Sequence, residues 1–165
     1  NQFLYVPICG IEVDFSSISY GPVNLGIEKM IAGDTIWNAL GPAGAGEPNK
    51  ATVRNIGNTW TSVTYMSDDM GFGQDVNDMW NVNFDLRMGN DDAYAIRPIM
   101  PFETVTLVNA LALSSQEELD FSIKVIKGFG GHAGNMTLGC ICRPFDYTDG
   151  PVVGIPSHTN GVLPR

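Results

Sequence analysis

Four carboxylates stand close together in residues 68–78, and carboxylate oxygens are the ligands that calcium prefers in proteins. They belong to Asp68, Asp69, Asp75 and Asp78. Their spacing does not follow the ligand order of an EF-hand loop, so a solvated acidic loop is the alternative to a calcium site. A second acidic turn lies at residues 90–92. We expect both turns at sheet ends, where they can hold divalent cations between neighbouring subunits, and we expect no other cofactor.

Catalytic chemistry has little support in the sequence. His132 and His158 are the only histidines, and each lies in a loop rich in Gly or Pro. No GxSxG, HExxH or Gly-x-Gly-x-x-Gly motif stands in a fitting context. The aspartates of residues 68–78 can act as an acid–base pair only where their surroundings shift their pKa values, and the sequence indicates no such surroundings. We therefore expect a protein without enzymatic activity.

Three cysteines, Cys9, Cys140 and Cys142, allow one disulfide and leave one thiol. Cys140 and Cys142 are two positions apart on a predicted strand, so a bond between them would be strained. The simplest pairing joins Cys9 to one of the two and leaves the other for a bond to a second copy. The alternatives are three reduced, buried cysteines, or a zinc site completed by His132.

Three tryptophans offer aromatic faces that can either stack on sugar rings or pack in the core. Trp80 alternates in phase with Val82 and Phe84, which predicts a place in the core. Trp60 is out of phase with its apolar neighbours and is the better surface candidate. Trp37 fits either role.

Runs of alternating polar and apolar residues must position these side chains. The most regular are residues 60–65, 80–86 and 120–127, and each predicts an antiparallel strand with one buried and one solvated face. With the weaker runs, the chain holds about eight or nine strands, which predicts an all-β, antiparallel two-sheet sandwich of jelly-roll or Ig-like type. One buried face is expected to combine Trp80, Val82, Phe84 and Leu86 with Phe121, Ile123 and Val125.

Weaker patterns complete the predicted fold. Alternation predicts a first strand at residues 11–15, a second at 18–25 after a kink, and at best a short edge strand at 35–37. Residues 114–117 have the Ser-x-x-Glu spacing of a capping box, which predicts one helical turn. On the last strand, one face is expected to carry Met136, Leu138, Cys140 and Cys142.

Length and composition limit the class of protein. The 165 residues are most simply one domain, 1–165, with an N-terminal arm at 1–10 and a C-terminal arm rich in Pro, Gly and Thr at 144–165. The net charge is −9 with only 9 basic residues, which argues against a nucleic-acid partner because phosphate binding requires clustered Lys and Arg. No apolar run approaches the roughly 20 residues of a membrane span.

Two features suggest an extracellular or cell-surface location. Asn1-Gln2 looks like the processed end of an exported chain whose signal peptide has been removed. Asn135-Met136-Thr137 is an N-glycosylation sequon, which makes Asn135 a candidate glycan site.

Several stretches resemble known surface proteins. Residues 11–15, the turn Gly33-Asp34 and residues 51–58 look like parts of exported Ig-like or jelly-roll modules. Much of the later chain is similar to the major sheath proteins of filamentous methanogenic archaea, notably residues 68–73, 80–85, 118–123 and 134–137. The resemblance covers most of residues 11–142. It implies a self-assembling, β-rich structural subunit that is stabilised by disulfides.

Strand edges are compatible with this implication. Soluble monomers usually protect their edge strands with Lys, Pro or bulges, whereas lysines are few here and the predicted strands are rich in Thr and Val. An open edge is a template for a strand of another copy. We expect a structural subunit of an extracellular sheath, surface layer or amyloid-like fibre, with itself as partner. The alternative is a secreted β-sandwich module that binds carbohydrate or cell-wall glycans through Trp60 and the acidic loops.

Overall fold

The computed structural model describes residues 6–38, 50–89 and 98–143. Eight strands run through these residues: β1 Ile11–Val13, β2 Glu28–Ile31, β3 Ala51–Asn55, β4 Trp60–Ser67, β5 Val82–Met88, β6 Val105–Leu111, β7 Gln116–Val125 and β8 Met136–Arg143. The described residues contain no helix, and so none with the length and apolar character that a membrane span requires. The predicted all-β class is confirmed.

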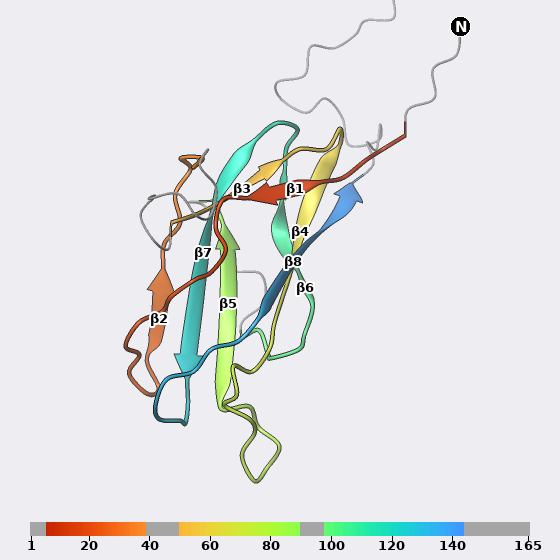
Figure 1. The fold of residues 1–165 in the computed structure, drawn as a ribbon. Coiled ribbons are helices and arrows are strands. Elements are labelled where there is room, and N and C mark those ends of the chain that lie inside the picture. Colours follow the sequence, from red (N-terminus) through yellow and green to blue (C-terminus); the bar gives the residue numbers. More distant parts are fainter. Residues whose placement is uncertain (1–5, 39–49, 90–97, 144–165) are drawn as a thin grey trace, which may run out of the picture.

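The strands form two antiparallel sheets that pack on each other (Figure 1). In the five-stranded sheet, the long strand β7 pairs with β5 along one edge. Along its other edge β7 pairs first with β3 and then with β2, while β1 pairs with β3. The three-stranded sheet has the order β6-β4-β8. The predicted two-sheet sandwich is confirmed.

The core lies between the sheets, and its register on β5 and β7 agrees with the alternation. Val82 pairs with Val125, Phe84 with Ile123 and Leu86 with Phe121, and all six side chains are buried. From the opposite sheet, the ring of Tyr65 meets the ring of Phe121 edge-on, with 6.2 Å between centroids. The shared buried face predicted for these six residues is confirmed.

Trp80 does not belong to this core, so its prediction was wrong. The side chain is only half-buried. Trp80 comes before β5, and its backbone forms an isolated antiparallel bridge with Gln74. Its ring packs against Phe102, which is itself exposed, with 5.6 Å between centroids. The physical reason is the turn before it: Asp75 N–H donates to the carbonyl of Met79, so the chain folds back before β5 begins.

Three weaker predictions were also wrong. Residues 18–25 and 35–37 are not strands. Residues 114–117 form no helical turn: Ser115 N–H donates to Ala112 in a tight turn, and β7 begins immediately afterwards. Pairing with β3 determines this outcome, because Gln116 lies opposite Arg54 and takes the backbone into the sheet. Strand β2 was not predicted, since its four residues show no clear alternation.

The prediction that the outer face of the central strands is solvated was also wrong in part. On the outer side of β5 and β7, Asp85, Asp120 and Ser122 are buried although they are polar. Asp120 is compensated there, because its Oδ1 accepts a hydrogen bond from Gly33 N–H (2.8 Å) and its Oδ2 pairs with the Arg87 guanidinium. A buried carboxylate needs such partners to stay charged.

Candidate functional site

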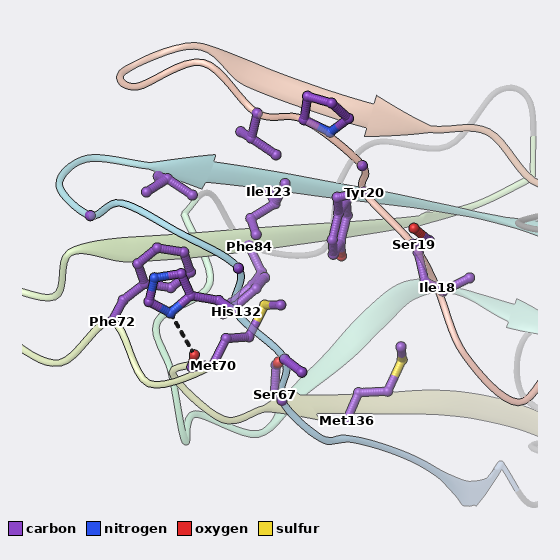
Figure 2. A pocket seen from close by; sticks show the side chains of 18 of the residues that line it. Ile18, Ser19, Tyr20, Ser67, Met70, Phe72, Phe84, Ile123, His132 and Met136 are labelled. Atoms are coloured by element: carbon purple, nitrogen blue, oxygen red, sulfur yellow. Dashed lines mark hydrogen bonds between the residues drawn. The ribbon is translucent and has the colours of Figure 1, made fainter.

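A cleft of about 700 Å³ opens between the segment that leads into β2 and the loop that leads into β8 (Figure 2). Residues 17–23 and Leu25 form one wall, and residues 128–136 form the other. Core side chains form the floor, among them Tyr65 from β4, Phe84 from β5 and Ile123 from β7. The cleft is thus the place where the interior of the sandwich is reached from outside.

The lining of the cleft is apolar and uncharged. Among the described residues that line it, none is Asp, Glu, Lys, Arg or Cys, although the chain carries a net charge of −9. Sequence reasoning did not find this site, because it interpreted one wall as a strand. A signal was present: residues 15–27 and 128–142, which contain both walls, include no charged residue.

Two tyrosine hydroxyls in the cleft are held in the neutral form. Burial raises the pKa of Tyr20 far above its ordinary value, and the nearby Tyr65 adds to the effect. Burial also raises the pKa of Tyr65 to about 12, against a smaller opposite effect of the hydrogen bond with Ser67. Neither hydroxyl therefore acts as a base at neutral pH, and the arrangement suits binding of an uncharged, apolar group.

His132 is held in the wall of the cleft by a ring contact and two carbonyls. Figure 2 shows its ring over Phe72, and the ring centroids are 3.8 Å apart. Its Nδ1 lies 3.1 Å from the carbonyl oxygen of Met70, and its Nε2 lies 3.1 Å from that of Phe129. The structure does not form the Cys3His zinc arrangement, because Cys9 and Cys142 are joined to each other.

Asp68 connects the acidic loop to the cleft wall. Its Oδ2 accepts a hydrogen bond from Asn135 N–H at 2.8 Å, and its Oδ1 accepts one from Met70 N–H at 2.9 Å. A Cβ at position 134 would collide with Asp68 Oδ1, so Gly134 is required for this close approach. Asp68 therefore acts as a clamp between residues 68–72 and 128–136.

The other aspartates predicted as calcium ligands also bind their own loop. Asp69 accepts hydrogen bonds from the N–H groups of Gly71 and Gly73, both at 3.0 Å. Asp75 Oδ1 accepts from the N–H groups of Met79 and Asn77, and these bonds lower the pKa of Asp75. For Asp78, the fourth predicted ligand, the backbone carbonyl oxygen accepts a hydrogen bond from Gln74 Nε2.

Metal ligands do not gather in the described part of the chain. There, no group of three or more His, Cys, Asp or Glu side chains is arranged to hold a metal ion. Asp68, Asp69 and Asp75 satisfy backbone donors instead, as Asp commonly does in turns. The second predicted acidic turn, at residues 90–92, lies outside the described residues.

One disulfide joins Cys9 to Cys142, with 4.9 Å between their Cα atoms, and Cys140 is a half-buried thiol. The described part of the predicted N-terminal arm is thus attached to β8. Asn58 holds it further, because Asn58 Oδ1 accepts from Ile8 N–H at 2.6 Å. Residues 1–5 and the predicted C-terminal arm at 144–165 lie outside the described residues.

The tryptophans are engaged in separate contacts, and the sequon is at the surface. The Arg54 guanidinium lies 3.8 Å from the ring centroid of Trp37, which covers one face of that indole. Trp60 is half-buried at the start of β4, opposite Arg143. Asn135 is exposed, and its side-chain Nδ2 donates to Asp68 Oδ2 at 3.2 Å.

Comparisons with protein-family models, with curated proteins and with solved structures found no match to this chain.

Proposed function

We propose that this chain is a self-assembling, non-catalytic structural subunit of an extracellular sheath, surface layer or fibre. The observation that carries the proposal is the edge strand β8. All eight of its residues pair with β4, from Met136 opposite Ser67 to Arg143 opposite Trp60. No described strand pairs with its other edge.

Strand β8 also lacks the features that protect edge strands in monomers. It contains neither Lys nor Pro, and its only charged residue is Arg143 at the end. Its pairing with β4 runs without a register shift, whereas the β4–β6 pairing shifts between Ser62 and Thr64. A regular, uncharged edge is a template for a strand of another chain.

Two further observations support the proposal. The outer face of the three-stranded sheet exposes apolar side chains, Ile141 on β8 and Val108 on β6, which suit contact with another copy. The disulfide between Cys9 and Cys142 supports an extracellular location, because such bonds persist in oxidising surroundings.

Sedimentation and electron microscopy of the purified chain test the proposal. We expect ordered polymers that resist detergent and whose β8 amides exchange more slowly than in any monomer fraction. A matched pair of variants locates the contact: Ile141→Lys on β8 should weaken assembly more than Val108→Lys on β6, which is a strand of the same sheet. A stable monomer that binds glycans would contradict the proposal and favour a carbohydrate-binding module.

A further inference from the structure

The cleft combines an apolar floor with a wall of open backbone. The floor of core side chains offers apolar contact, and the wall at residues 128–136 is rich in glycine. A Cβ placed on Gly131 would meet no atom within 4 Å, so there is open space beside the backbone of this wall. An incoming chain can approach a glycine wall closely enough to use its backbone groups.

Exposed apolar residues extend the surface beyond the mouth of the cleft. Phe129 is 96 % exposed and Leu25 is 57 % exposed, and these two side chains lie on opposite walls. An adjoining hollow of about 430 Å³ shares both residues and the Phe72–His132 ring pair with the main cleft. Large exposed apolar side chains around an apolar cleft indicate a surface that a partner covers.

A segment of matching chemistry follows β8 in the same chain. Residues 150–164 contain no Asp, Glu, Lys or Arg, and residues 151–156 read Pro-Val-Val-Gly-Ile-Pro. Proline restricts its own backbone and that of the residue before it to extended conformations, so such a segment loses little conformational entropy when it binds as a strand. Val153 and Ile155 are two positions apart and would lie on the same face.

The direction of β8 favours another copy's cleft over the chain's own. Met136, the first residue of β8, lines the cleft. The strand then runs away from the cleft to Arg143, opposite Trp60, at the end where Cys142 is bonded to Cys9. The described chain therefore ends, at Arg143, at the end of β8 that is remote from the cleft.

We infer that the cleft of one copy binds residues 151–156 of a second copy, with Val153 and Ile155 directed at its apolar floor. This inference rests on the proposed assembly and adds to the contact at the β8 edge a second contact, which the assembly also requires. The donor segment and the acceptor cleft are made of different residues. Such a head-to-tail contact forms an open filament unless its rotation closes a ring.

A variant that fills the acceptor tests the inference. Gly131→Trp adds a large side chain to the cleft lining at a position where the Cβ meets no atom within 4 Å, and it causes no backbone strain because Gly131 does not require a positive φ. We expect the critical concentration for assembly to rise at least about tenfold, with an unchanged melting temperature of the subunit. Ile36→Trp, at a 75 % exposed side chain outside both the cleft lining and the three-stranded sheet, is the matched control and should assemble as the wild type does.

A second variant disables the donor. Val153→Asp combined with Ile155→Asp should abolish assembly, because two carboxylates would enter an uncharged cleft. Thr159→Asp, in the same uncharged stretch, is the control and should leave assembly unchanged. An equimolar mixture of the donor variant with Gly131→Trp should yield dimers in sedimentation, since one partner keeps an open cleft and the other keeps an intact segment.

The outcomes separate this inference from the proposed function. Polymers formed by both Gly131→Trp and the donor variant would overturn the inference and leave the proposed assembly intact. A wild type that stays monomeric while both variants melt at lower temperature would place the segment in its own cleft and overturn both. A mixture that contains only monomers would overturn the exchange between copies.

Discussion

At the scale of single residues, several described aspartates hold the backbone in place through their carboxylates. Asp68, Asp69 and Asp75 each accept backbone N–H groups two residues ahead, and that local pattern can be recognised in a sequence. The longer connections cannot be recognised, because Asp68 reaches Asn135 and Asp120 reaches Gly33, each across most of the fold. The sequence therefore could not predict which of these carboxylates hold distant parts of the fold together.

Phe84 provides a test of the core. Its side chain is 2 % exposed, pairs across to Ile123 and forms part of the cleft floor. Phe84→Ala should lower the free energy of unfolding by about 3–5 kcal/mol, because it removes a buried ring and leaves a cavity. Denaturant titration measures the loss. Phe102→Ala, at a 55 % exposed ring, is the control and should cost far less.

The two tyrosines of the cleft predict a loss of stability in alkali. In the folded state the pKa of Tyr65 is raised to about 12 from the ordinary value of 10.0, and that of Tyr20 is raised further. Below pH 10 the tyrosine hydroxyls are protonated in both the folded and the unfolded chain, so their contribution to the free energy of unfolding is complete. Above pH 10 they ionise first in the unfolded chain, so the free energy of unfolding falls as pH rises through the folded pKa. Urea unfolding from pH 10 to pH 12 should show this fall. A smaller slope in Tyr65→Phe would support the assignment, and an unchanged slope would contradict it.

At the scale of strands, alternation identified most of the sandwich but not its connections. Strands β4, β5 and β7 were predicted because each has one face against the core, and this gives period two. Strand β2 was missed because it is a short strand whose place depends on distant contacts with β7. The cleft could not be predicted, since residues 17–23 form a wall through packing against core residues far away in sequence.

A substitution at Gly33 tests the close packing of the segment that follows β2 against strands β3 and β7. An added Cβ would lie 2.6 Å from the carbonyl oxygen of Leu119 and 2.7 Å from its nitrogen, and closer still to the carbonyl oxygen of Ala51. Gly33→Ala should therefore destabilise the fold by about 1–3 kcal/mol, because backbone atoms of two strands would have to shift. Thermal melting measures the effect. Gly131→Ala, where the added Cβ meets no atom within 4 Å, should melt as the wild type does.

At the scale of the whole molecule, the two ends of the sandwich have different chemistry. One end is closed by the disulfide between Cys9 and Cys142, and by the hydrogen bond from Ile8 N–H to Asn58. The cleft opens near the other end of β8, where Asp68 joins the wall at residues 128–136 to residues 68–72. A molecule whose two ends differ in this way suits a head-to-tail interface, in which one end of a copy contacts the other end of the next. It suits a symmetric dimer less well, because there both copies use the same surface patch.

Removal of the disulfide should weaken the fold of each subunit. Cys9 and Cys142 are 133 positions apart, so their bond closes a long loop and restricts the unfolded chain. Replacement of both cysteines by Ser should lower the free energy of unfolding by about 2–4 kcal/mol. Denaturant titration without reductant measures it, with Cys140→Ser as the control that keeps the bond. Equal stabilities for the two variants would contradict a stabilising role.

Cys140 leads to the last prediction, which concerns covalent bonds between copies. It is the free thiol of β8, two positions before Cys142 and on the same face of the strand. A thiolate can attack a nearby disulfide and exchange partners, so packed copies can transfer the bond of Cys9 from Cys142 of one chain to Cys140 of another. In the proposed assembly we expect at least some chains to be linked in this way, visible as multimers on non-reducing gels and as monomers after reduction. Cys140→Ser should remove the multimers and preserve the subunit disulfide. If detergent alone releases wild-type monomers whose Cys140 reacts fully with an alkylating reagent, only non-covalent contacts join the copies.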